Sequence, residues 1–339
     1  VLFRSFLLVL LCLLSVGYTK PRLSFSVDGT FKILQITDTH YGQNLNADVN
    51  TTDITRTLLD IEHPDFVVFT GDMVAGGDWN HTEGWFRDRW LHWTLPVREQ
   101  NTPYAYTLGN HDDEANLSRR EIIELDMTNP TSLTSLSLPE EDGASNFVVP
   151  VYRSEENDEV ALNLWFFDSM DYGCYQTKGN GCVSLNMIRW FRQKRSELQA
   201  KQGGVKRGLA FMHIPPQEMM YAWDHYLARG NKNEKTCCQA MNTGIVSAFL
   251  EDHSIQGLFV GHDHCNDFIV DFEGITMAYG RKTGVGGYGP SPNQKHGGRV
   301  ILLTLNSTDI STYIRQEDGS VDTQSLRFGL SSEQTVCDV

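Results

Sequence analysis

The sequence predicts a layered α/β or α+β domain whose C-terminal part is rich in strands. Three observations carry this prediction. The chain has 339 residues, of which 40% are hydrophobic, so it can bury a sizeable core. Up to about residue 265, short apolar runs alternate with segments of helical period, and beyond it apolar runs follow one another without helices. Since no interior linker or repeat interrupts this pattern, we expect a single domain over residues 22–339.

Each predicted element follows from its local pattern. Apolar runs of strand length end at turn residues or at polar clusters and are expected at 31–37, 65–70, 104–108, 162–168, 208–213 and 257–262. Helical periodicity predicts helices near 52–62, 82–99, 117–127, 185–200 and 240–253. The consecutive C-terminal strands are "DFIVDF", "GITMAYG", "RVILLTL" and "DISTYI".

The N-terminal segment, residues 1–18, has the pattern of a secretory signal peptide. An early arginine precedes an apolar stretch from Phe6 to Leu14, which small residues follow. This stretch is short for a membrane span, although an uncleaved anchor is the alternative. We therefore expect a secreted protein, extracellular or in an endomembrane lumen such as the vacuole, with no transmembrane segment after cleavage.

Other features agree with export. Glycosylation sequons occur at Asn50, Asn80, Asn116 and Asn306. Six cysteines follow the signal peptide and permit three disulfides, of which Cys174–Cys182, flanking a short glycine-containing loop, is the easiest local pair. The formal net charge is −15, from 43 acidic and 28 basic side chains, and no basic run could follow a phosphate backbone. A nucleic-acid partner is therefore not expected.

Polar side chains follow five of the predicted strands at the point where each strand ends. The segments are Asp38-Thr39-His40, Gly71-Asp72, Gly109-Asn110-His111-Asp112, His213 and Gly261-His262-Asp263-His264. Sites in α/β sheets gather at the carboxyl ends of strands, and Asp, His and Asn are metal ligands. Ligands two residues apart on extended backbone point to the same side. One such motif alone would be read as a turn, but the five together predict a metal site.

This ordered set resembles the calcineurin-like metallophosphoesterase superfamily over roughly residues 31–305. The stretches "FTGDMV", "LGNHDDE", "HIPPQE", "GHDHCND" and "YGRKTGVGGYG" are most similar to the purple acid phosphatase-related branch that lacks an N-terminal β-domain. The resemblance implies a double β-sandwich flanked by helices, with a two-metal site at the carboxyl ends of the strands. It also implies a hydrolase that uses a metal-activated hydroxide against small phosphomonoesters.

The resemblance assigns ligands residue by residue. It implies that Asp72 bridges the two metals. The first metal would be held by Asp38, His40, Asp72 and His264, and the second by Asp72, Asn110, His213 and His262. This mixed set of imidazole and oxygen ligands fits Fe, Zn or Mn.

Several residues near these ligands have two interpretations. His111 is expected to neutralise a phosphoryl oxygen or protonate the leaving group, with Asp112 either its orienting partner or part of an acidic turn. For Glu114 the acidic turn is the preferred interpretation. Arg281, in the glycine-rich stretch 279–289, would either contact substrate phosphate or belong to a surface crossing.

Departures from related patterns narrow the expected function. Purple enzymes have an iron-binding tyrosine where this chain has Ala75, so a purple chromophore is not expected. The stretch "GDMVAGG" lacks the second Asp and the Arg that protein serine/threonine phosphatases carry. The open alternatives to a phosphatase are a phosphodiesterase acting on nucleotides or phospholipid head groups, and a metal-binding protein without catalysis.

Overall fold

The structure is a computed structural model that describes residues 20–138, 142–327 and 334–338. The signal peptide expected at residues 1–18 lies outside these ranges. Among the described residues, no helix combines the length and the apolar character that crossing a membrane requires.

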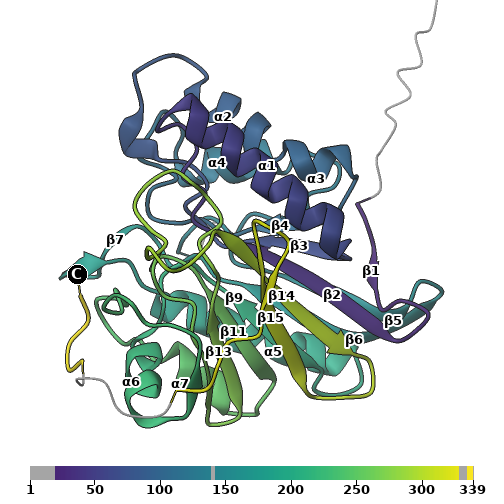
Figure 1. The fold of residues 1–339 in the computed structure, drawn as a ribbon. Helices are drawn as coiled ribbons and strands as arrows, with labels where there is room; N and C mark the ends of the chain where they lie inside the picture. The colour runs from purple at the N-terminus through teal and green to yellow at the C-terminus, as the bar shows by residue number, and fades with distance from the viewer. Residues whose placement is uncertain (1–19, 139–141, 328–333, 339) are drawn as a thin grey trace, which may run out of the picture.

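Two large sheets form the centre of the molecule (Figure 1). The strands described in the first sheet have the order β1-β5-β6-β9-β11-β13-β12-β10, and those in the second have the order β16-β15-β14-β2-β3-β4. The first sheet consists of Leu23–Ser24, Phe147–Ser154, Asn157–Phe166, Arg207–Phe211, Ile255–Val260, Ile275–Tyr279, Ile269–Phe272 and Ala228–Arg229. The second consists of Val321–Asp322, Ile310–Gln316, Gly297–Thr304, Thr30–Ile36, Phe66–Phe69 and Tyr104–Tyr106. A separate hairpin pairs β7 (Tyr172–Cys174) with β8 (Thr177–Asn180).

Helices cover the outer face of each sheet (Figure 1). On the second sheet lie α1 (Leu45–Glu62), α2 (Trp85–Trp93), α3 (Leu95–Glu99) and α4 (Arg119–Asp126). On the first sheet lie α5 (Leu185–Lys201), α6 (Gln217–His225) and α7 (Ile245–Leu250). A short 3-10 helix, η1, spans Gly76–Asp78. The molecule therefore has four layers, with a helical layer outside each sheet.

Side chains that point alternately to the two faces of the central strands produce these layers. In β2, Phe31 and Ile33 pack between the two sheets, whereas Leu34 and Ile36 pack under the helices. In β11, Phe259 faces the other sheet and its neighbour Leu258 faces α5 and α7. Because both faces of these strands are buried, they read as continuous apolar runs in the sequence.

The expected layered fold is confirmed, and so are the ten predicted strands, with small shifts of their ends. Four helices differ from the prediction, among them α7, which covers Ile245–Leu250 instead of the expected 240–253. The first helix starts earlier, at Leu45, because the Asn44 side chain accepts a hydrogen bond from Ala47 N at 2.9 Å and caps it. The helix expected at 82–99 is two helices, since Pro96 near the start of α3 has no N–H to continue the first one. Helix α6 was not predicted.

The two disulfides among the described cysteines are Cys174–Cys182, which confirms the expected local pair, and Cys238–Cys337. Cys237 and Cys265 are free. The described residues therefore contain two of the three disulfides that the cysteine count permits.

Candidate metal centre

The loops after five parallel strands converge at one edge of the two sheets. Asp38 and His40 follow β2, Asp72 follows β3, Asn110 follows β4, His213 follows β9, and His262 and His264 follow β11. All except His262 are buried, and His262 is half-buried.

These side chains form two groups that share Asp72. In the first group, the Nε2 atoms of His40 and His264 are 3.0 Å apart, and His264 Nε2 lies 3.5 Å from Asp38 Oδ1. The candidate ligand atoms of each group lie within 4.8 Å of one another. The first group combines imidazole nitrogens with carboxylate oxygens. This set of ligand atoms fits a cation such as Fe, Zn or Mn.

The second group surrounds the His213 imidazole. Its Nε2 lies 3.2 Å from Asp72 Oδ2, 3.2 Å from Asn110 Oδ1 and 3.3 Å from His262 Nδ1. Four candidate ligands thus meet here, with the Asn110 amide oxygen as the neutral member. Asp72 lies in both groups through the same oxygen, since its Oδ2 is 3.7 Å from His40 Nε2 and 3.2 Å from His213 Nε2, whereas Oδ1 accepts a hydrogen bond from His111 N.

Backbone carbonyls fix the tautomers of two of these imidazoles. His213 Nδ1 donates to Thr70 O at 2.7 Å, and His264 Nδ1 donates to Tyr288 O at 2.8 Å. Because a carbonyl can only accept, Nδ1 carries a proton, and in the neutral imidazole Nε2 has its lone pair directed at the cluster. Such outer hydrogen bonds orient imidazole ligands in metal sites.

The protonation tendencies of the imidazoles differ. Burial lowers the pKa of His262 to about 3, and burial with the Lys282 cation lowers the pKa of His40 well below its usual value. These two imidazoles are therefore neutral and can bind a cation. Burial opposes a charge on His213, but the Asp72 carboxylate outweighs burial and raises the pKa of His213 to about 9. A cation bound to His213 Nε2 would therefore displace a proton from it.

The ligand loops do not have the extended backbone that the D-x-H and H-x-H spacings suggested. Asp38, His40, Asp72 and His262 all have positive φ, at 54°, 49°, 51° and 77°. Bends, not strand alternation, direct their side chains inward, and His262 and His264 enter different groups.

The glycine-rich segment 280–289 wraps the first group. A Cβ on Gly284 would lie 2.1 Å from Thr39 O, and one on Gly289 would lie 2.9 Å from His264 Cβ. The Tyr288 ring stacks on His264 with ring centres 4.2 Å apart. Only residues without a side chain allow this backbone to pass so close to the ligands.

The cation of this segment that reaches the ligands is Lys282, which sequence reasoning missed beside Arg281. Lys282 is 1% exposed and its Nζ donates to Asp38 O at 2.9 Å. The expected phosphate contact by Arg281 conflicts with the structure, because its buried guanidinium pairs with Asp267 and Asp322 and donates to Lys295 O. Its donors are occupied by protein groups.

His111 stands beside the first group and is half-exposed. Its ring centre lies 5.5 Å from that of His40, and its backbone N donates to Asp72 Oδ1 at 2.9 Å. Its Nδ1 lies 2.8 Å from Glu114 Oε2. Burial opposes protonation, but Asp72 and Glu114 raise the pKa of His111.

The partner of His111 is therefore Glu114, not Asp112. The Asp112 carboxylate is fully buried and accepts backbone N–H groups of Asp72, Met73, Val74 and Gly109 at 2.7–3.2 Å. It joins the loops after β3 and β4. This corrects the expected orienting role of Asp112. Glu114 is the exposed turn residue that was expected, and it also holds the His111 imidazole.

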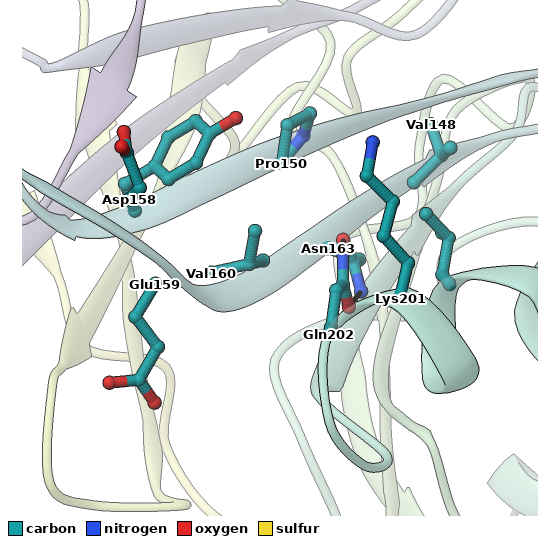
Figure 2. Close-up of a pocket in the computed structure, with 10 residues that line it drawn as sticks. Val148, Pro150, Asp158, Glu159, Val160, Asn163, Lys201 and Gln202 are labelled. Carbon is teal, nitrogen blue, oxygen red and sulfur yellow. Dashed lines mark hydrogen bonds between the residues drawn. The ribbon is translucent and has the colours of Figure 1, made fainter.

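A separate hollow lies away from these groups, between β5, β6 and the C-terminal end of α5 (Figure 2). It has a volume of about 310 Å³, and Val148, Pro150, Val160, Asn163 and Lys201 are among its lining residues. None of its lining residues belongs to either ligand group.

Comparisons with known proteins agree with this geometry. The calcineurin-like phosphoesterase family matches residues 31–266. The chain is 29% identical to "Probable inactive purple acid phosphatase 29" of Arabidopsis thaliana over 90% of this chain and 85% of that protein. It is 30% identical to "Probable inactive purple acid phosphatase 28" of the same plant, over 86% and 82%. A dimetal phosphatase from Danio rerio shares the fold with a TM-score of 0.56 at 14% identity, over 87% of this chain and 98% of that one.

Proposed function

Because the chain belongs to the calcineurin-like phosphoesterase family, we propose that it is a secreted, metal-dependent phosphatase that hydrolyses phosphomonoesters. One observation carries the proposal. Two buried groups of imidazoles and carboxylates share Asp72, and the half-exposed His111 stands beside them where a substrate can reach it.

The chain's own groups divide into two ligand sets. Asp38, His40, Asp72 and His264 would hold one cation, and Asp72, Asn110, His213 and His262 the other. Two cations at such a site lower the pKa of a water and neutralise phosphoryl oxygens. Asp112 and the hydrogen bonds to Thr70 and Tyr288 keep the ligand loops and imidazoles in place.

His111 is the group best placed to act on the departing alcohol. Its Nδ1 is held by Glu114, which leaves Nε2 to donate a proton to the ester oxygen as the bond to phosphorus breaks. A fixed imidazole beside the cluster also lies where it can stabilise negative charge on the phosphoryl oxygens.

The proposed site of action is extracellular or lumenal, and the proposed form is one domain over residues 22–339. The two disulfides support an oxidising compartment. Of the sequon residues, Asn50, Asn80 and Asn306 are exposed, and Asn116 is half-buried with its Oδ1 accepting Phe86 N at 3.0 Å. We propose glycan attachment at the three exposed positions first.

Metal content and turnover measured on one sample test the proposal. We expect about two metals per chain, hydrolysis of p-nitrophenyl phosphate faster than bis(p-nitrophenyl) phosphate, and loss of both metal and turnover after chelation. His111→Ala should keep its metals and lose about 10²- to 10⁴-fold in turnover. His92→Ala, which changes an exposed histidine on α2, is the matched control and should match the wild type.

Three results would redirect the proposal. Preference for the diester would identify a phosphodiesterase. Bound metal with no turnover of either ester would leave the metal-binding protein without catalysis, as the names of the two Arabidopsis relatives suggest for those proteins. Unchanged turnover in His111→Ala would remove this imidazole from the reaction.

A further inference from the structure

The hairpin β7–β8 lies against the metal centre and is tied down at several points. The Cys174–Cys182 disulfide closes it, and both cysteines are buried, at 1% and 3% exposure. Gly181 N donates to Asp171 O at 2.8 Å, and Leu185 N donates to the Tyr175 hydroxyl at 2.8 Å. The first residue of the hairpin, Tyr172, is therefore presented from a fixed piece of backbone.

The Tyr172 hydroxyl joins two groups of the site. It accepts a hydrogen bond from Asn110 Nδ2 at 3.3 Å and donates one to Glu114 Oε1 at 3.1 Å. Both contacts use the hydroxyl, so a phenylalanine at this position would lose them and keep the ring.

The contact with Asn110 determines which end of the amide faces the second ligand group. With Nδ2 turned to Tyr172, Oδ1 lies 3.2 Å from His213 Nε2. An amide rotated by 180° would present its N–H₂ group, a donor that repels a cation. The phenol therefore favours the orientation that can bind metal.

The contact with Glu114 determines where the His111 imidazole is held. Glu114 uses Oε2 for His111 Nδ1 and for Gly77 N, and Oε1 for Tyr172. A carboxylate held on both oxygens has one side-chain conformation, so the imidazole it holds has one as well. Asn110, Tyr172, Glu114 and His111 thus form one continuous hydrogen-bonded chain.

We propose that Tyr172 is a positioning residue for the hydrolysis, which orients the metal-binding amide of Asn110 and, through Glu114, the imidazole of His111, and that the Cys174–Cys182 disulfide holds it there. This inference rests on the proposed phosphatase function. It gives the disulfide-closed hairpin a part in the reaction beyond stabilising the fold.

Tyr172→Phe tests the role of the hydroxyl. Tyr221→Phe, which changes an exposed tyrosine on α6 outside both ligand groups, is the matched control. If the His111 imidazole is misplaced, turnover should fall most for esters with poor leaving groups, because these leaving groups need protonation. We expect kcat on an alkyl phosphate such as glycerol 2-phosphate to fall about 3- to 10-fold, with p-nitrophenyl phosphate changed less than 2-fold and KM unchanged. Metal retained after dialysis against a weak chelator should also fall.

The control variant and the measurement of metal retention show which part of the proposal is wrong if the expected result is not found. Tyr221→Phe should match the wild type in the ratio of alkyl to aryl turnover and in metal retention. A Tyr172→Phe variant that matches the wild type in both the alkyl-to-aryl ratio and metal retention would overturn the proposal. If the wild type hydrolyses no monoester, the proposed phosphatase function is wrong, whatever the role of Tyr172. Equal metal retention in the two variants would then show that Tyr172 does not orient Asn110.

A pair of double variants tests the disulfide. Cys174→Ser/Cys182→Ser should reproduce the altered leaving-group ratio and the weaker metal retention. Cys238→Ser/Cys337→Ser removes the other disulfide and should lower Tm with the ratio unchanged. A wild-type ratio and wild-type metal retention in the first double variant would refute the part assigned to the hairpin's disulfide.

Discussion

Adding a single methyl group at Gly284 should disrupt the first ligand group. A Cβ there would lie 2.1 Å from Thr39 O, 2.3 Å from Thr39 Cα and 2.4 Å from Thr39 C. Carbon contacts are normally about 3.5–4.0 Å, so the two backbone segments must separate by about 1 Å or more. Thr39 lies between Asp38 and His40, so the separation moves both ligands.

The magnitude follows from the tolerance of the site. Metal–ligand distances tolerate about 0.2 Å, and a displacement of about 1 Å at reacting groups costs on the order of 10²-fold in rate. We therefore expect Gly284→Ala to lose metal from the first group and about 100-fold in turnover. Overpacking of this kind costs about 1–3 kcal/mol of folding free energy, so the variant should still fold.

Gly274→Ala is the matched control. Gly274, in the turn between β12 and β13, has a φ of +83°, and a Cβ there would meet no atom within 4 Å. The control carries backbone strain of about 1–2 kcal/mol without touching the ligands. Metal content by mass spectrometry, turnover of p-nitrophenyl phosphate and Tm would be measured for both variants. A Gly284→Ala protein with full metal content and turnover within 2-fold of the wild type would refute the reasoning.

Two further predictions concern stability. Glu62 is buried, and although burial opposes its charge, hydrogen bonds from Arg315 and Tyr313 lower its pKa below the usual 4.5. A lowered folded pKa gives stability that is fully present above about pH 4.5 and is lost as the pH falls through the folded pKa. Glu62→Gln should therefore lower Tm at pH 7, and its difference from the wild type should be smaller at pH 3. A constant difference at both pH values would contradict this. Arg119→Met should cost about 3–5 kcal/mol, because it leaves the fully buried Asp168 without its partner at 2.5 Å. Arg120→Met, in an exposed pair, should cost under about 0.5 kcal/mol, and equal losses in urea unfolding would count against the buried pair.

The strands could be predicted because burial on both faces leaves a strong signal. The run from Phe31 to Ile36 is apolar except at Lys32 and Gln35, and it emerges as a central strand between helices and a second sheet. The assignment of strands to sheets could not be predicted in the same way. "GITMAYG" and "RVILLTL" look alike, yet β13 joins the first sheet and β14 the second. The glycine-rich segment between them crosses from one sheet to the other over the ligands.

The residues at strand ends could be predicted as a group, but their individual partners could not. Asp112 and Glu114 both follow His111 in an acidic run, and sequence distance favours Asp112. The turn after β4 instead directs Asp112 inward to four backbone N–H groups and returns Glu114 to the imidazole. Tyr172 is 62 residues away from Asn110 and 58 from Glu114 along the chain, and the disulfide-closed hairpin brings it there.

The backbone of the ligand loops explains why glycines and ligands stand side by side in the motifs. Asp72 and His262 have positive φ, a conformation that costs a non-glycine residue on the order of 1–2 kcal/mol. Glycine would relieve that strain but would remove the ligand. The glycines that precede these ligands are required for a different reason, because a side chain there would clash with a neighbouring loop. A Cβ on Gly71 would lie 2.6 Å from Gly109 N, and one on Gly261 would lie 2.2 Å from Thr37 Oγ1. Close packing at the glycine holds the strained ligand beside it in place, so each Gly-ligand pair is one structural unit, and the spacing of the motifs follows from it.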